Sequence, residues 1–403
     1  MRSPWVLSLF FLSGVAANQA AVESCPPVPA NFTLSPPQPR GSRELPDPFR
    51  TVRGERITKK SEWECRRSEI AELAQRHELG PIPGPPTVLS ATVVNDTQLV
   101  VEITEDNNTI SFTANITFPT VGYPPYPVLI GINGINFPTP PTVAKVIFPM
   151  DQLAQPAETF VRPREGLFYT LYGRDHPAGL TAAGAWATSR VIDAIELMAE
   201  ATGLDPGRVG VTGCLRNGRT ALAAGGFDER VALTVAREAG AGGSSCYRLR
   251  VDDRPAPGGI DVCNTLQCPP YPDGGQTAAF AHFYDNPHEL PFDRHGVAAL
   301  VAPRPLLVLQ SDVNWLEPKS SFQCMGAAKK VYDALGVPDR MAVSVMGGLS
   351  VCQLSHRQEA LLDAYLRKFL LREEDVDFDT DVIEKDVDWE PLPAYNWTVP
   401  ILE

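Results

Sequence analysis

Residues 213–218, GCLRNG, have the spacing of a nucleophile elbow, the sharp turn that exposes a reactive side chain between a strand and a helix. The apolar run VGVT precedes this turn and the helix-forming run RTALAA follows it. Acyl transfer at such a turn needs a nucleophilic atom at the tip and a base that takes its proton. The residue at the tip is Leu215, which has no nucleophilic atom, so the sequence predicts the turn without its attacking group.

The elements around the elbow indicate a doubly wound, mostly parallel sheet, because short apolar strands alternate with helical segments. Thr87 to Thr117 contains three β-rich alternating runs, which predict an antiparallel sheet edge. Parallel strands are predicted at 127–134, 208–213, 231–240, 304–312 and 340–348, and helices at 61–78, 189–201, 324–336 and 359–371. In such sheets the functional loops lie at the carboxyl ends of the strands, where the elbow also lies.

The other two members of a hydrolase triad would follow the nucleophile in the order acid, then histidine. Glu238 lies at the end of the next predicted strand and is placed as the acid. The histidine is expected in the loop after the last strand, VMGGLSVCQL at 345–354, and that loop contains none.

Four blocks of the sequence resemble the glucuronoyl esterases, carbohydrate esterase family fifteen. VTGCLRNGRTA resembles the family's V-T-G-C-S-R-N-G-K-x-A block, and TVAREAGAGGSSC resembles T-x-P-Q-E-S-G-x-G-G-x-x-C. The segment from LPFDRH to NWLEP resembles a third block, and MGGLSVCQL resembles the G-x-H-x-H-C-x-F loop. The resemblance implies an α/β-hydrolase fold, a three-layer sandwich whose family cleaves the ester between 4-O-methyl-glucuronoyl groups of xylan and lignin alcohols.

The resemblance also implies a role for each site position. The nucleophile position falls on Leu215 and the base position on Val351, so both catalytic side chains are replaced. Glu238 keeps the acid, and Arg216 keeps an oxyanion-stabilising arginine. The implied substrate-binding residues are Arg219, Gln276, Tyr284 and Trp315.

The eight cysteines allow 105 connectivities from sequence alone. The resemblance implies Cys214–Cys352, Cys25–Cys65 and Cys246–Cys324, and leaves Cys263–Cys268 as an extra pair. A local disulfide is favoured over a metal site for this C-x4-C pair, since no second pair or histidine cluster lies nearby. No metal and no cofactor is expected, because the family's reaction needs neither.

We therefore expect a catalytically silent homologue that binds glucuronoyl sugars. Losing the nucleophile or the base of a serine protease costs about 10⁶ in turnover. Two alternatives remain open: an esterase with weak or altered activity through direct attack by water, and a secreted interaction protein without sugar binding. Arg216 and Glu238 are also compatible with an ion pair that only supports the turn. His356 is interpreted as a surface or capping residue and His295 as a structural one.

The N-terminus predicts secretion. Arg2, the apolar run WVLSLFFLSGV and the small residues at 15–17 are typical of a signal peptide. A membrane anchor is disfavoured, because a span needs ~20 apolar residues. The even number of cysteines agrees with an oxidising compartment, as do five glycosylation sequons, at Asn31, Asn95, Asn107, Asn115 and Asn396.

Composition bounds the remaining expectations. The chain of 403 residues is long enough for one large domain with extensions, and its net charge of −13 disfavours nucleic acid and acidic membranes as partners. We expect an extracellular monomer, and the resemblance implies glucuronoxylan or a lignin–carbohydrate ester as its partner. The expected organisation is a signal peptide at 1–17, a proline-rich arm at 18–60, the esterase-like domain at 61–375 and an acidic extension at 376–403.

Overall fold

The structure is a computed structural model. It describes residues 25–30, 32, 39, 42–155, 164–249, 277, 280, 282–283, 286–376, 383–385 and 395–403. Gln276, Tyr284, Asn31 and the Cys263–Cys268 pair lie outside these described residues.

A ten-stranded sheet forms the centre of the molecule. Strands β1, β2, β3 and β5 pair antiparallel, and β5, β4, β6, β7, β8, β9 and β10 pair parallel. In spatial order the strands are β1 (Val88–Val94), β2 (Gln98–Glu105), β3 (Asn108–Thr117), β5 (Ala144–Phe148), β4 (Tyr126–Ile132), β6 (Leu204–Cys214), β7 (Val231–Arg237), β8 (Leu306–Ser311), β9 (Met341–Met346) and β10 (Ile383–Lys385). The predicted antiparallel edge and mostly parallel sheet are confirmed.

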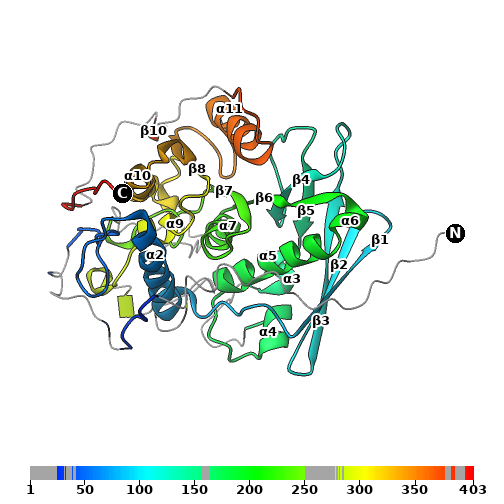
Figure 1. The fold of residues 1–403 in the computed structure, drawn as a ribbon, viewed down its shortest axis with the longest axis horizontal. Coiled ribbons are helices and arrows are strands. Elements are labelled where there is room, and N and C mark those ends of the chain that lie inside the picture. Colours follow the sequence, from blue (N-terminus) through cyan, green and yellow to red (C-terminus); the bar gives the residue numbers. More distant parts are fainter. Residues whose placement is uncertain are drawn as a thin grey trace.

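Helices cover both faces of this sheet, which makes three layers (Figure 1). Neighbouring residues of one strand enter different cores: Val308 of β8 packs with α5, α7, α9 and α10, whereas Leu309 packs with α11. Both faces of the sheet are therefore buried, which explains the uninterrupted apolar runs of the parallel strands. The helices are α2 (Lys60–Ala74), α3 (Met150–Leu153), α4 (Leu167–Tyr172), α5 (Leu180–Leu197), α6 (Ala199–Thr202), α7 (Arg216–Phe227), α9 (Arg294–Ala299), α10 (Pro318–Ala334) and α11 (His356–Tyr365).

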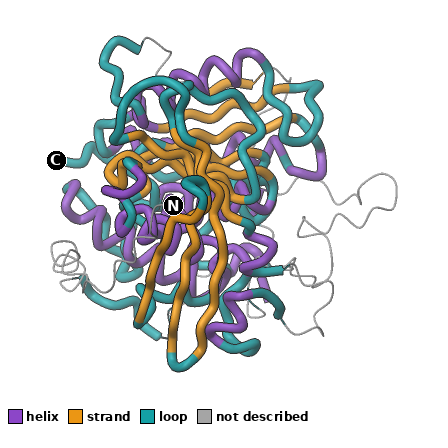
Figure 2. The backbone as a smooth tube through the Cα atoms, turned by 90° about the vertical axis from the view of Figure 1, so that its right-hand side faces the viewer, coloured by secondary structure: helices purple, strands orange, loops and turns teal. Residues whose placement is uncertain are grey.

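The antiparallel strands extend to one end of the molecule (Figure 2). Their solvent side carries three of the predicted glycosylation sites. Asn95 and Asn107 lie in the two hairpin turns and Asn115 lies on β3, and all three are exposed. Every helix in the described part of the chain is too short or too polar to cross a bilayer.

Several elements differ from the predictions, and three of these differences have a clear physical reason. The helix predicted at 189–201 begins at Leu180, and it is interrupted at Met198. Its start was missed because the first turns are buried all round by small residues, which show no amphipathic period. The strand predicted at 231–240 ends at Arg237, since Glu238 leaves the strand with φ 49°. Strand β5 was not predicted, because its segment AKVIF is short and interrupted by a lysine.

Candidate active site

The elbow is built as the sequence predicts. Strand β6 ends at Cys214, α7 begins at Arg216, and Leu215 between them has φ 57° and ψ −126°. A non-glycine residue held in such a region costs about 1–3 kcal/mol and persists only where the surroundings impose it. The half-buried side chain at the tip of this strained turn is an isobutyl group, which can neither attack a carbonyl nor carry a proton.

Two glycines and one backbone hydrogen bond hold the turn in place. A Cβ on Gly213 would lie 2.3 Å from the carbonyl oxygen of Asn217, and one on Gly218 would lie 2.2 Å from that of Arg237. The backbone N–H of Leu215 donates to the Arg237 carbonyl at 3.1 Å. The elbow is thus packed against the end of β7, and its shape does not depend on a reactive side chain.

The base position is tied covalently to the elbow. Cys214 and Cys352 form a disulfide with their Cα atoms 6.0 Å apart. Leu215 follows the first cysteine and Val351 precedes the second, so the bridge keeps both replaced positions in the same small region. Val351 is half-buried in the loop after β9.

Glu238 occupies the acid position at the end of β7, with 2% of its surface exposed. Its carboxylate accepts hydrogen bonds from the Ser311 backbone N–H at 2.9 Å and from the Ser311 hydroxyl at 3.0 Å. Burial raises the pKa of Glu238 to about 7 despite these hydrogen bonds. The group is therefore neutral in mildly acidic solution, and no imidazole is present at position 351 to compensate its charge.

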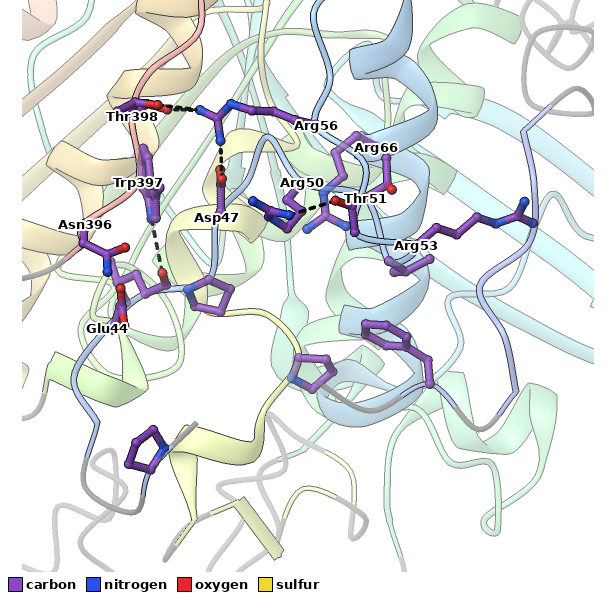
Figure 3. Close-up of a pocket in the computed structure, with 17 residues that line it drawn as sticks. Glu44, Asp47, Arg50, Thr51, Arg53, Arg56, Arg66, Asn396, Trp397 and Thr398 are labelled. Carbon is purple, nitrogen blue, oxygen red and sulfur yellow. Dashed lines mark hydrogen bonds and ion pairs between the residues drawn. The ribbon is translucent and has the colours of Figure 1, made fainter. Parts of the chain in front are cut away.

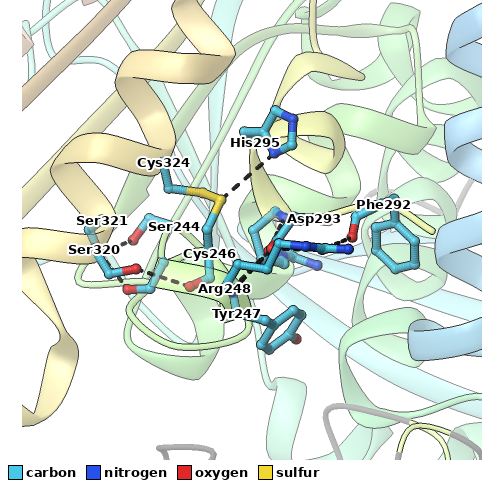
Figure 4. The surroundings of a disulfide bond; sticks show 12 residues. Ser244, Cys246, Tyr247, Arg248, Phe292, Asp293, His295, Ser320, Ser321 and Cys324 are labelled. Atoms are coloured by element: carbon cyan, nitrogen blue, oxygen red, sulfur yellow. Dashed lines mark hydrogen bonds and ion pairs between the residues drawn. A yellow bond between two sulfur atoms is a disulfide. The ribbon is translucent and has the colours of Figure 1, made fainter. Parts of the chain in front are cut away.

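The loop that begins with Glu238 is anchored from behind (Figure 4). A disulfide joins Cys246 to Cys324 on α10, and the Ser320 hydroxyl donates to the Cys246 carbonyl at 3.1 Å. Ser321 is hydrogen-bonded to the hydroxyls of Ser244 and Ser245, at 3.0 and 2.7 Å. These buried contacts fix the loop on α10, and their serines were not singled out in the sequence because nothing there shows that they meet.

A third anchor is Arg237, which has only 1% of its surface exposed. Its guanidinium donates to Asn136 in the loop after β4 and to the carbonyl of Cys352 in the loop after β9. It also lies 5.0 Å from the centre of the Phe137 ring. Burial lowers the pKa of Arg237 to about 10, so the group still carries its charge at neutral pH. This residue joins three loops of the site and was not predicted from the sequence.

Arg216 and Arg219 differ in their environments. Arg216 lies half-buried on the first turn of α7 and forms an ion pair with Asp151 of α3 at 3.1 Å. Its described ion pair is not with Glu238, which is bonded to Ser311 instead. Arg219 is only 3% exposed, and its Nε donates to the Ala239 carbonyl at 3.1 Å.

Trp315 lies half-buried in η5 (Asn314–Leu316), directly after β8. This turn packs on the Glu238 loop, since a Cβ on Gly240 would lie 3.0 Å from the side chain of Leu316. Elbow, acid loop, tryptophan turn and Val351 loop thus all lie at the carboxyl ends of β6, β7, β8 and β9. Their common edge is the place where open α/β sheets bind ligands.

The histidines offer no replacement base next to a serine. His356 is fully exposed at the start of α11 and lies 3.5 Å from Glu359. His295 is buried, its Nε2 lies 2.8 Å from the Pro46 carbonyl oxygen, and burial lowers its pKa to about 4. Among the described residues, no histidine is hydrogen-bonded to a serine hydroxyl. The interpretation of His295 as structural agrees with these contacts.

The remaining predicted pair, Cys25–Cys65, is also a disulfide, so three of the implied pairings are present in the described residues. Together with the layered sheet and the elbow, they define the α/β-hydrolase fold.

Comparisons with known proteins identify the branch of that class. Residues 101–336 match the family model for glucuronyl esterase of fungi. The 4-O-methyl-glucuronoyl methylesterase of Neurospora crassa is 40% identical over 329 residues, which are 82% of each chain. That of Hypocrea jecorina is 38% identical over 379 residues, covering 94% of this chain and 79% of the relative.

Solved structures give the same result. The glucuronoyl esterase of Sporotrichum thermophile superposes with a TM-score of 0.84 at 36% identity, covering 94% of this chain and all of that one. A mutant of that enzyme, solved in complex with methyl 4-O-methyl-beta-D-glucopyranuronate, superposes with a TM-score of 0.82 over 91% of this chain and 96% of its own. The chain belongs to the glucuronoyl esterase family, whose characterised members are carboxylic ester hydrolases.

Proposed function

We propose that this chain is a secreted member of the family that binds glucuronoyl sugars and does not hydrolyse their esters. The observation that carries the proposal is the strained elbow with Leu215 at its tip. Hydrolysis by the family route passes through an acyl-enzyme, in which a side-chain oxygen bonds to the carbonyl carbon and its proton moves to an imidazole. Positions 215 and 351 supply neither group.

Retained binding is supported by what surrounds the elbow. Arg219 is hydrogen-bonded to the loop at 238–245, Glu238 begins that loop, and the turn that carries Trp315 packs on it through Leu316. The loop is fixed by the Cys246–Cys324 disulfide. An arginine can hold a carboxyl group with two parallel hydrogen bonds, and the flat face of a tryptophan suits a sugar ring. The relative from Sporotrichum thermophile binds a methyl glucuronate in this fold.

The test combines a hydrolysis assay with a titration on the same pure protein. With methyl 4-O-methyl-glucuronate as substrate, we expect no turnover above buffer, with the Hypocrea jecorina relative as the positive control. Calorimetric titration with the same ester should show binding that is weakened by Trp315→Ala. Clear hydrolysis would contradict the loss of catalysis. Absence of binding at millimolar ester would contradict the sugar-binding function and favour a protein that has lost its ligand.

Secretion is the second part of the proposal. The disulfides Cys25–Cys65, Cys214–Cys352 and Cys246–Cys324 support it, because such bonds persist in oxidising compartments. Four sequon asparagines, Asn95, Asn107, Asn115 and Asn396, are exposed. We expect protein from the culture medium to begin near residue 18 and to lose mass on enzymatic removal of N-glycans, as measured by mass spectrometry. A mature chain that still carries residues 1–17 would contradict this part.

A further inference from the structure

A cavity of about 770 Å³ lies far along the chain from the elbow, between the segment before α2 and the C-terminal segment (Figure 3). Its wall includes residues 44–47 and 50–54, Arg56 and Arg66 on one side and Asn396, Trp397 and Thr398 on the other. None of its lining residues belongs to the elbow or to the loops after β7, β8 and β9. Its volume is that of an ordinary small-ligand site.

The lining is richer in cations than in anions, although the whole chain has a net charge of −13. Four arginines line it against two carboxylates, Glu44 and Asp47. Arg56 forms an ion pair with Asp47 at 2.5 Å, and Arg66 pairs with Glu69 at 2.9 Å. The two remaining arginines have no carboxylate partner among the described residues: the Arg50 guanidinium donates to the Gly54 carbonyl, and Arg53 is exposed.

These two guanidinium groups are carried by a turn that is already ordered. Arg50 and Arg56 form an antiparallel bridge, and the Gly54 N–H donates to the Thr51 carbonyl at 2.9 Å. Phe49 and Ile57 anchor the two ends of the turn in the core. The Val52 N–H donates to Glu69 of α2 at 3.1 Å, so the tip cannot swing away from the helix. Binding at such a turn would cost little ordering entropy.

The opposite wall is held by the same network. Arg56 donates to the carbonyl and the hydroxyl of Thr398, and the Trp397 indole N–H donates to the Leu45 carbonyl at 3.2 Å. Trp397 stacks on Tyr395 with ring centres 4.0 Å apart. The cavity thus combines unpaired guanidinium groups with rigid aromatic and proline surfaces, a mixture that suits an anionic ligand with an apolar body.

We propose that this cavity is a second carbohydrate site, which binds the uronate carboxylate of an acidic oligosaccharide through Arg50 and Arg53. A carboxylate would supply the anionic partner that both guanidinium groups lack, and the sugar rings would lie against the proline and aromatic wall. The site makes no use of the elbow, so it stands whether or not the elbow region binds sugar.

The experiment titrates aldotetraouronic acid, a xylotriose bearing one 4-O-methyl-glucuronate, into the Trp315→Ala variant, which removes the contribution of the elbow region. The protein is used after removal of N-glycans, because Asn396 lies in the cavity wall. We expect millimolar or tighter binding. Arg50→Ala with Arg53→Ala in the same background should weaken it at least tenfold.

The matched control is Arg174→Ala with Arg372→Ala, which removes the same charge elsewhere. Arg174 is exposed, like Arg53, and Arg372 donates to a backbone carbonyl, as Arg50 does. This control should leave the affinity unchanged. Neutral xylotriose should bind at least tenfold more weakly than the acid.

Three outcomes would overturn the second site. The first is that aldotetraouronic acid does not bind the Trp315→Ala variant, and the second is that the control pair weakens binding equally. The third is that inorganic phosphate competes and binds as tightly as the sugar, which would indicate a simple anion site. Failure of the ester titration on the unmodified protein would instead affect only the proposed function of the elbow region.

Discussion

The elbow at 213–218 and the acid loop at 238–245 are neighbours, yet only the acid loop presents a carboxylate, whereas the tip of the elbow is Leu215. Leu215 and Glu238 both have positive φ, 57° and 49°. The acid loop keeps the carboxylate and its two hydrogen bonds from Ser311, whereas the elbow has lost the group that the turn would present.

This comparison indicates that packing contacts fix the backbone of the elbow and that a catalytic side chain at its tip is not needed for its shape. The close approach of Gly213 and Gly218 to backbone carbonyls and the Cys214–Cys352 bridge impose the turn whatever side chain stands at its tip. Glu238, in contrast, is held by its own side-chain hydrogen bonds, so its loss would change the loop. Four experiments test this contrast, in order of decreasing expected effect.

Restoring both missing groups should restore chemistry if the frame is intact. We expect Leu215→Ser with Val351→His to hydrolyse methyl 4-O-methyl-glucuronate at least about 10³-fold faster than the unmodified protein, since loss of such groups costs about 10⁶ in a serine protease. The two single variants should stay silent, because the serine needs the base. A silent double variant that still binds the ester would show that the packing argument is wrong.

Adding one methyl group at Gly218 should damage the elbow, because its Cβ would lie 2.2 Å from the Arg237 carbonyl oxygen. We expect Gly218→Ala to lower the free energy of unfolding by about 3 kcal/mol. Gly326→Ala on α10, where a Cβ meets nothing within 4 Å, is the control and should be neutral or slightly stabilising. Chemical denaturation measures both, and equal effects would refute the close-packed turn.

The buried carboxyl of Glu238 should make stability depend on pH. Its pKa is raised to about 7 in the folded chain from 4.5, so the folded state holds the proton more tightly. The contribution of the protonated Glu238 carboxyl to the free energy of unfolding is complete below pH 4.5. As the pH rises through 7 this contribution is lost, and the loss is about 2 kcal/mol between pH 5 and pH 7.5.

The variant Glu238→Gln isolates that contribution. His295 acts in the opposite direction, because burial lowers its pKa to about 4 and stability is lost as the pH falls below its unfolded value. We therefore expect the difference in unfolding free energy, Glu238→Gln minus wild type, to increase from pH 5 to pH 7.5. A difference that stays constant across this range would show that the pKa of Glu238 is not raised in the folded chain.

The smallest effect concerns the strain at Leu215. Glycine accepts φ 57° without steric cost, so Leu215→Gly should raise the free energy of unfolding by about 1 kcal/mol. Leu354→Gly is the control: that leucine is also half-buried but has no positive φ, and its loss should destabilise. If both variants destabilise equally, the elbow stores no strain.

The sequence predicted five of the parallel strands and the position of the elbow, because both are local patterns of apolar residues and glycines. Apart from the disulfide partners that the family resemblance implied, it could not predict side-chain partners that are distant along the chain. Arg216 meets Asp151, which lies 65 residues earlier, and Arg237 meets Asn136, 101 residues earlier. The start of α5 at Leu180 was missed for a related reason, since complete burial removes the amphipathic period on which the prediction depends.

Arg237 has a consequence for the way in which a ligand arrives. Arg237 is the last residue of β7, and its guanidinium is hydrogen-bonded to the loops after β4 and β9. These three segments are therefore joined at one side chain. Outward movement of any one of these segments would leave the buried charge of Arg237 without one of its hydrogen-bond partners. The edge of the sheet at this site is therefore held in one shape, and a ligand that binds there would be selected by its fit to that shape.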